Sequence, residues 1–211
     1  MRRLPVYILI QTSGAMRGEP VEAIKVGLET MTAAWRQDPF ALESVHISMI
    51  AFSRSPQQLL PLTSLEQIQI PPIAQPVAGG THLGEALEYV CKKVDQEVKF
   101  GSNEEKGDWM PLLYVLCDGR ASDQQLFMQT VPEVKRRSFA SIIACLVGNK
   151  LQPDNVKLFA DTVVQLDTAD GATFRKFFKW VSDSVGVSNR SLGAIGEAPL
   201  PPPPPEVLTI I

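Results

Sequence analysis

The sequence lacks several features that define simple protein classes. No stretch approaches the roughly 20 apolar residues that a membrane-spanning helix needs. The basic start, Met1–Pro5, is followed by a short apolar run without a small-residue cleavage site, which favours a first strand over a signal peptide. The 20 Lys and Arg residues against 23 Asp and Glu residues leave a net charge of −3, without a basic excess. We therefore expect a cytoplasmic protein that binds neither nucleic acid nor membrane.

Cysteine is also scarce. The three cysteines, Cys91, Cys117 and Cys145, are an odd number and lack the paired spacing of a zinc site. Two of them fall inside apolar runs. We expect buried free thiols, as is usual in a cytosolic protein, and neither a disulfide nor a redox pair.

Apolar runs of strand length recur along the chain. They are nearly continuous and do not alternate strictly with polar residues, which is typical of strands covered on both faces. The expected strands are Val6–Ile10, Val45–Phe52, Leu112–Cys117, Ser141–Val147 and, more weakly, Thr162–Leu166.

Helical segments lie between these strands. Pro20 suits the first turn of a helix that runs to about Trp35, and Thr81 is a suitable N-cap for a second helix. A third helix is expected over Asp123–Arg137, shortened or broken by Pro132. Shorter helices are expected over Asp154–Phe159 and Thr173–Val185, and a solvated loop over Phe100–Asp108.

Alternating strands and helices predict an α/β fold with a mainly parallel central sheet and helices on both faces. The proline-rich stretch Pro56–Gln75 can contribute one antiparallel edge strand. We expect residues 1–188 to form this domain and residues 189–211 to form a Gly/Pro-rich tail with a polyproline run. The apolar end, Val207–Ile211, is either a free terminus or a strand that docks on a partner or on its own domain.

Three loops with polar residues are expected at the carboxyl ends of the strands, where ligands bind in open α/β sheets. The first is Gln11–Met16, after the first strand. The second is Gly79–Thr81, before a helix, and the third is Cys117–Asp123, after the strand that begins at Leu112.

Together these loops resemble the metal-ion-dependent adhesion site of the von Willebrand factor A (VWA) family. The resemblance implies a three-layer, Rossmann-like VWA fold and a site of two aspartates, two serines and a threonine around a divalent cation. Ser13, Thr81 and Asp118 stand at the second, fourth and fifth ligand positions. Gln11 replaces the first aspartate and Ala15 replaces the second serine of the Asp-x-Ser-x-Ser pattern.

A narrower resemblance is to the TerY-type VWA proteins of bacterial tellurium-resistance systems. It implies a scaffold in tellurium resistance or stress response, with a protein kinase and a PP2C-like phosphatase as partners. The residues that carry it are Arg2–Tyr7, Met16–Pro20, Arg36–Pro39, Gly79–Thr81 and Phe178–Ser182.

The two replacements weaken the case for a cation such as Mg²⁺, which usually needs one or two carboxylates. Asp118 alone supplies a negative charge, so we expect no cofactor, with Ser13, Thr81 and Asp118 as the ligands if a cation binds. We hypothesise a metal-free hydrogen-bonded cluster of Gln11, Ser13, Thr81 and Asp118, in which the Gln11 amide donates to Asp118 or Thr81.

Four further residues are candidates for contacts at the mouth of this site. Arg17 and Arg120 either bind a partner's carboxylate or phosphate or are solvated loop residues. His82 is either a partner contact or an exposed histidine in a first helical turn. Asp123 either approaches the site or caps the helix that follows it.

These observations favour a non-catalytic protein-binding module with a degenerate metal site. One alternative is a Mg²⁺-dependent adhesion site that binds a partner's carboxylate. The other is a hydrolase or phosphotransfer enzyme, although Ser13 has no base in an obvious triad context and no Walker-type lysine follows Gly79–Gly80.

Overall fold

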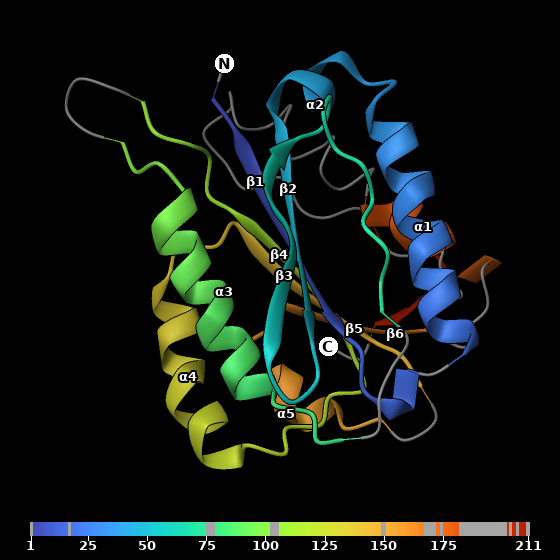
Figure 1. The fold of residues 1–211 in the computed structure, drawn as a ribbon, viewed down its shortest axis with the longest axis vertical. Coiled ribbons are helices and arrows are strands. Elements are labelled where there is room, and N and C mark those ends of the chain that lie inside the picture. The colour runs from blue at the N-terminus through green and yellow to red at the C-terminus, as the bar shows by residue number, and fades with distance from the viewer. Residues whose placement is uncertain are drawn as a thin grey trace.

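The computed structural model describes residues 2–16, 18–74, 79–101, 106–148, 151–166, 172–173, 175–181, 202, 204–205 and 207–209. Strands and helices alternate along most of the chain (Figure 1). In chain order the elements are β1 (Leu4–Gln11), the 3-10 helix η1 (Gly14–Met16), α1 (Glu19–Trp35), α2 (Pro39–Ser44), β2 (Val45–Phe52), β3 (Pro56–Ser64), α3 (Leu83–Glu97), β4 (Leu112–Cys117), α4 (Gln124–Arg136), β5 (Ser141–Leu146), α5 (Pro153–Lys157), β6 (Thr162–Leu166) and β7 (Val207–Thr209).

The strands form one sheet in the order β3-β2-β1-β4-β5-β6-β7. β1, β2, β4, β5 and β6 are parallel, whereas β3 pairs antiparallel with β2. The predicted fold class, with β3 as the antiparallel edge strand, is confirmed. A second antiparallel strand, β7, closes the opposite edge, because the end of the tail docks on its own domain.

Helices cover both faces of the sheet (Figure 1). The side chains of β1 alternate between two cores: Ile8 faces α1 and the helical residues 175–181, and Leu9 faces α3 and α4. This alternation follows from the two-residue period of a strand. Both residues are almost fully buried, which explains why the apolar runs are continuous.

The prediction that Pro132 shortens or breaks its helix is wrong, because α4 is continuous from Gln124 to Arg136. Proline removes one N–H bond, here to the carbonyl of Met128, whose side chain is exposed. The opposite face of α4 buries Phe127, Val131 and Val134 against the core. Burial of three large apolar groups, at about 1.5 to 3 kcal/mol each, outweighs the cost of the proline, about 3 kcal/mol.

Residues 182–201 lie outside the described part of the chain, so the predicted boundary near residue 188 stays a prediction. The expected helix over Thr173–Val185 is helical at the described residues 172–173 and 175–181. No helix among the described residues is both long and apolar enough to cross a membrane.

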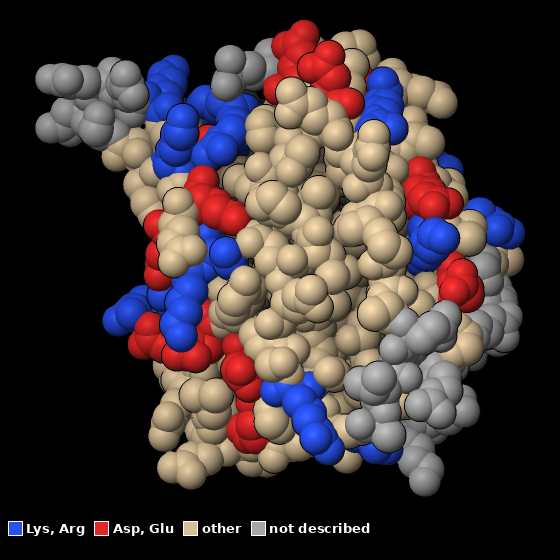
Figure 2. All heavy atoms as spheres, viewed as in Figure 1, with Lys and Arg blue, Asp and Glu red and all other residues tan. Residues whose placement is uncertain are grey.

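Charged side chains are unevenly spread over the face in Figure 2. Lys and Arg lie beside Asp and Glu over α3 and along α1, whereas the middle of the face, over β3 and the segment after it, is largely uncharged. Residues 56–74 contain a single charged side chain, Glu66. This face shows no basic stripe of the kind that binds nucleic acid.

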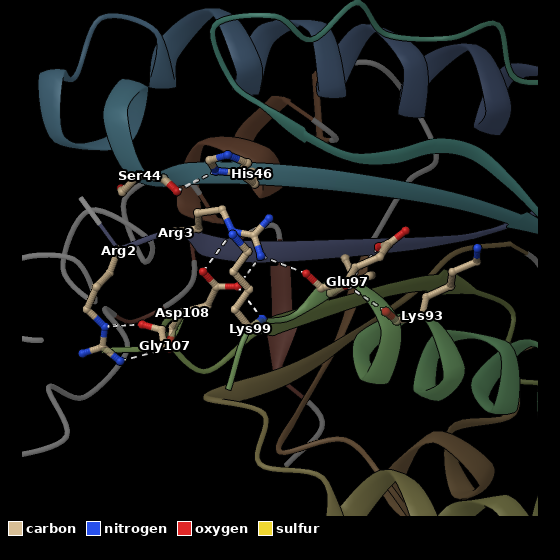
Figure 3. A network of polar contacts seen from close by, with 10 residues as sticks. Arg2, Arg3, Ser44, His46, Lys93, Glu97, Lys99, Gly107 and Asp108 are labelled. Atoms are coloured by element: carbon tan, nitrogen blue, oxygen red, sulfur yellow. Dashed lines mark hydrogen bonds and ion pairs between the residues drawn. The ribbon is translucent and has the colours of Figure 1, made fainter. Parts of the chain in front are cut away.

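A polar network lies at the amino-terminal end of β1, away from the carboxyl ends of the strands (Figure 3). The Arg3 guanidinium donates to both carboxylate oxygens of Asp108, at 2.9 Å and 2.5 Å, and to the carbonyl of Glu97 at 2.8 Å. The N–H of Lys99 also donates to Asp108, at 2.7 Å. The network ties the start of β1 to both ends of the loop over residues 99–108.

This network predicts sensitivity to acid. Burial raises the pKa of Asp108, but the hydrogen bonds from Arg3 and from the N–H of Lys99 outweigh it and hold the pKa below its ordinary value. The folded state therefore favours the carboxylate, and its stabilisation is present at neutral pH and lost as the pH falls below about 4. We expect Asp108→Asn to lower the free energy of unfolding by about 2 kcal/mol at pH 7. Urea unfolding at pH 7, 5 and 3 should show this difference shrinking toward pH 3, and a constant difference would contradict the account.

Candidate functional site

The three predicted loops meet at the carboxyl ends of β1 and β4, beside the start of α3 (Figure 1). Gln11 is the last residue of β1, Thr81 precedes α3, and Asp118 follows β4. The side chains of Gln11, Ser13, Thr81 and Asp118 are all buried, with 0 to 4% of each residue exposed. Buried polar groups need hydrogen-bond partners, so the partners of these four define the site.

The Gln11 amide is the centre of the cluster. Its Nε2 donates to Ser13 Oγ at 2.5 Å and faces Thr81 Oγ1 at 3.4 Å. Its Oε1 accepts from the backbone N–H of Asp118 at 2.9 Å. A backbone N–H can only donate, so the amide oxygen must face it and the NH₂ group must face the two hydroxyls. Gln11 thus links all three loops, and it meets Asp118 at the backbone and not at the carboxylate.

The Asp118 carboxylate is bound by Arg120. Oδ1 accepts from the Arg120 backbone N–H at 2.9 Å, and Oδ2 lies 3.7 Å from Arg120 Nε, an ion pair without a hydrogen bond. The Asp118 side chain is 3% exposed, whereas that of Arg120 is 42% exposed. The Arg120 side chain thus reaches the surface, whereas its Nε is buried without a hydrogen-bond partner among the described residues, and its positive charge balances the buried carboxylate.

Backbone geometry fixes the loop after β4. Gly119 has a φ of +82°, in the left-handed region that glycine adopts without penalty. A Cβ at this position would lie 2.2 Å from the carbonyl oxygen of Gln152. The N–H of Gln152 donates to the Asp118 carbonyl at 2.8 Å, and Asn155 Nδ2 donates to the Gly119 carbonyl at 2.8 Å. The start of α5 thus holds Asp118 in place.

Ser122 joins the second and third loops, and the sequence did not identify it as a site residue. Its Oγ accepts from the backbone N–H of Thr81 at 3.0 Å, and its own N–H donates to the Thr81 carbonyl at 2.7 Å. The only signal was its place within Cys117–Asp123, because a serine in a loop has many local partners. This reciprocal pair sets the position of the Thr81 hydroxyl.

The predicted helix caps need correction. Thr81 is not the N-cap of α3; His82 holds that position, without a side-chain capping bond. Asp123 holds the N-cap position of α4, as predicted, but its side chain makes no capping hydrogen bond to that helix. Its carboxylate accepts from the N–H groups of Gly84 and Glu85 at 3.2 Å and 2.8 Å, so it caps the neighbouring helix α3. The two helix starts lie side by side, and Asp123 reaches across between them.

We expect Asp123→Ala to lower the free energy of unfolding by about 1 kcal/mol, as for other N-cap losses. Asp123→Asn keeps an oxygen acceptor and should lose less. Urea unfolding of the two variants measures both effects. Equal losses would show that the carboxylate acts through its charge and not through the cap.

The remaining predicted mouth residues have mixed outcomes. Arg17 lies outside the described residues. The backbone of Ala15 belongs to η1, and its side chain is outside the described part. His82 is partly exposed, and its Nδ1 lies 3.3 Å from Glu85 Oε2.

The site offers buried hydroxyls, an amide and one ion pair. Ser13 Oγ receives the Gln11 amide hydrogen, and within the described residues no histidine bonds to it. Burial raises the pKa of Cys117, next to Asp118, to about 12, so this thiol is not a ready nucleophile. No cluster of three His, Cys, Asp or Glu side chains forms among the described residues. The one carboxylate of the cluster is already engaged by Arg120.

The sheet order, the two helical layers and the three loops define a VWA-type α/β domain. The model of the von Willebrand factor type A domain matches residues 6–168. The chain belongs to this family, whose domains are in general non-catalytic modules for protein–protein interaction. No curated relative matches the sequence.

Solved structures with the same fold come from distant organisms. A von Willebrand factor type A protein from Catenulispora acidiphila superimposes with a TM-score of 0.65 at 15% identity, covering 87% of this chain and 42% of its own. The ArnB paralog VWA2 from Sulfolobus acidocaldarius gives 0.59 at 17% identity, covering 87% and 45%. Proximal thread matrix protein 1 from the mussel byssus, solved with a zinc-occupied MIDAS motif (the metal-ion-dependent adhesion site), gives 0.60 at 15% identity, covering 86% and 48%. The chain thus spans less than half the length of each of these proteins.

Proposed function

We propose that this chain is a non-catalytic protein-binding VWA module that binds its partner without a divalent cation. The binding surface is the mouth formed by the three loops, with Arg120 at its rim. The observation that carries the proposal is the Gln11 amide, which donates toward Ser13 and Thr81, two residues at ligand positions of the family's metal site.

The donor set does not fit a hard cation. Mg²⁺ usually takes one or two carboxylates and neutral oxygens in octahedral geometry. The NH₂ group of Gln11 can only donate, so it competes with a cation for the same oxygens. The carboxylate of Asp118 is paired with Arg120, which a cation would have to displace. The mussel protein with zinc in its MIDAS motif has the same fold. In this proposal, cation binding therefore depends on the residues at the ligand positions and not on the fold.

The partner is bound, in this proposal, by polar contacts at the mouth. Arg120 is 42% exposed at its side chain and presents guanidinium N–H groups beyond its contact with Asp118. A carboxylate or phosphate on the partner fits this group, because guanidinium pairs with both in a bidentate geometry. A partner's acidic group would thus meet Arg120 where other VWA domains offer a metal ion.

We further propose a scaffold role in a bacterial tellurium-resistance or stress-response system, with a degenerate metal site. The support is the resemblance to TerY-type proteins in segments such as Met16–Pro20 and Arg36–Pro39. That resemblance makes a protein kinase and a PP2C-like phosphatase the candidate partners. The three buried free thiols, Cys91, Cys117 and Cys145, suit a reducing cytoplasmic setting.

The test is a binding assay with the purified candidate kinase and phosphatase, using wild-type, Asp118→Ala and Glu43→Ala proteins. Glu43 is exposed on α2, away from the three loops, and serves as the matched control. We expect binding to wild type and Glu43→Ala to be equal with Mg²⁺ or with EDTA, and Asp118→Ala to bind at least tenfold more weakly. Binding that EDTA abolishes would support the Mg²⁺-dependent alternative instead. Equal binding by all three proteins would exclude the mouth as the interface.

A further inference from the structure

A fourth loop borders the three-loop mouth, and the sequence did not identify it as part of the site. It is the turn over residues 53–55, between β2 and β3, which lies beside the start of α3 (Figure 1). The backbone N–H of His82 donates to the Ser53 carbonyl at 2.8 Å, and the backbone N–H of Thr12 donates to the Phe52 carbonyl at 2.7 Å. The turn is therefore fixed to both the first and the second loop of the mouth.

Arg54 is the charged residue of this turn. No other Asp, Glu, Lys or Arg occurs in the sequence between Glu43 and Glu66. Arg54 is exposed, and its side chain makes no hydrogen bond or ion pair with the residues that the structure describes. Residues 75–78, which lie outside the described part, contain no acid. The guanidinium group of Arg54 thus keeps its hydrogen-bond donors available to a ligand.

Gly79 leaves the space in which the Arg54 side chain lies. A Cβ at Gly79 would be 2.9 Å from Nε, 3.4 Å from Cγ and 3.5 Å from Cδ of Arg54. The Arg54 side chain therefore lies against the backbone of the second loop, two residues before Thr81. This contact places the guanidinium group at the rim of the mouth, although Arg54 belongs to a different loop.

Arg54 and Arg120 flank the mouth. The sheet order β2-β1-β4 puts the turn after β2 and the loop after β4 on opposite sides of the loop after β1. Neighbouring strands lie roughly 4.8 Å apart, so the carboxyl ends of β2 and β4 are separated by about 10 Å. The buried cluster around Gln11 lies at the end of β1, between them.

The acids of the mouth are already engaged within the domain. Asp118 is paired with Arg120, the Asp123 carboxylate accepts from two backbone N–H groups at the start of α3, and Glu85 Oε2 lies 3.3 Å from His82 Nδ1. Arg120 keeps unused donors, because its buried Nε has no hydrogen-bond partner among the described residues and its side chain is 42% exposed. The mouth thus offers two guanidinium groups to an anionic ligand.

We propose that Arg54 and Arg120 together bind an extended acidic segment of the partner, which carries two acidic side chains three positions apart. A guanidinium group binds a carboxylate through two parallel N–H···O bonds. In an extended segment of polyproline II geometry, residues three positions apart lie on the same side, about 9 Å from each other. This spacing matches the separation of the two strand ends. The pair rests on the proposed function, since Arg120 is its binding residue, and Arg54 adds selectivity for a second acid.

The test is an NMR titration of the ¹⁵N-labelled full chain with three synthetic peptides in a Gly/Ser background. The first carries two glutamates three positions apart, the second carries one glutamate, and the third carries two adjacent glutamates. We expect the first peptide to bind about fivefold more tightly than the second, the upper end for an exposed ion pair. The third peptide has the same charge as the first and should gain less. The Nε–H resonances of Arg54 and Arg120 should both shift with the first peptide.

Four variants identify the residues responsible. Arg54→Gln should remove the fivefold preference for the first peptide. Gly79→Ala should also reduce it, because the added methyl group displaces the flexible Arg54 side chain without removing its charge. Arg120→Gln should weaken the binding of all three peptides. Lys135→Gln removes an exposed cation near the other end of α4 and is the matched control, which should bind like wild type.

The outcomes separate this pair from the proposed function. If Arg54→Gln binds like Lys135→Gln while Arg120→Gln binds more weakly, the mouth remains the interface, but Arg54 is only a solvated turn residue. If Arg120→Gln also binds like wild type, or if no peptide binds, neither arginine holds an acidic segment. Equal affinity for the spaced and the adjacent glutamates would show attraction by net charge alone and would also overturn the proposal.

Discussion

Replacing Gly84 by valine is expected to lower the free energy of unfolding by about 3 kcal/mol, the upper end of overpacking costs. A Cβ at Gly84 would lie 2.4 Å from the backbone N and 2.6 Å from the Cα of Phe127, and 2.9 Å from Asp123 Oδ2. Because two of these atoms are backbone, no rotamer change relieves the overlap, and α3 and α4 must move apart. Denaturant unfolding, with the midpoint and slope reported separately, measures the loss.

The substitution Gly84→Ala sets two opposite effects on the free energy of unfolding against each other, and the sign of the measured change shows which is larger. Alanine has a helix propensity about 1 kcal/mol more favourable than that of glycine, so an isolated α3 would be stabilised by Gly84→Ala. Its single methyl group meets the same backbone atoms of Phe127, and we therefore expect a net loss. A gain in stability would show that the two helices adjust freely and that their contact does not position the Asp123 cap.

The double substitution Gln11→Asp with Ala15→Ser is expected to create a divalent-cation site. It restores a second carboxylate and a second serine beside Ser13, Thr81 and Asp118, and it removes the Gln11 NH₂ group that donates toward two of these oxygens. At a Mg²⁺ concentration 100 times the dissociation constant, binding adds about 2.7 kcal/mol to stability. For a domain of this size that raises the melting temperature by about 5 to 10 °C.

Thermal unfolding with Mg²⁺, Mn²⁺ or EDTA measures this gain. The triple variant that adds Asp118→Ala is the control, because it removes the original carboxylate and should lose the gain. Without metal, the double variant should be less stable than wild type, since two carboxylates then lie close together in a buried site. If Mg²⁺ stabilises wild type and the double variant equally, Gln11 does not exclude the cation.

Much of the fold could be predicted because it depends on local patterns. Val6–Ile10 and Thr162–Leu166 are short apolar runs, and both are strands within one or two residues of the prediction. β3 could only be placed within the wide range Pro56–Gln75, because its alternation is weak and prolines interrupt it. β7 was one of several alternatives for the tail, since three residues of strand propensity do not identify the edge on which they pair.

The site could be predicted less completely, because its contacts cross the chain. The three loops and their order followed from the strand ends and from the VWA resemblance. The partner of Asp123 did not, because a local cap on α4 and a cap across to α3 are indistinguishable in sequence. In the sequence, Gly84 is simply a residue of low helix propensity, and only the structure shows that its lack of a side chain allows the close contact with Phe127. The Gln11 amide was expected at Asp118 or Thr81, and only three-dimensional geometry shows Ser13 as its nearest acceptor.

The most direct test of the central claim is isothermal titration of Mg²⁺ and Mn²⁺ into the wild-type protein, in parallel with the double variant Gln11→Asp with Ala15→Ser. A metal-free mouth predicts no saturable heat for wild type and saturable one-site binding for the double variant. Saturable binding to wild type that Asp118→Ala abolishes would contradict it. That result would mean that the Gln11 amide and the Arg120 ion pair yield to a cation, and that the mouth is a working metal site.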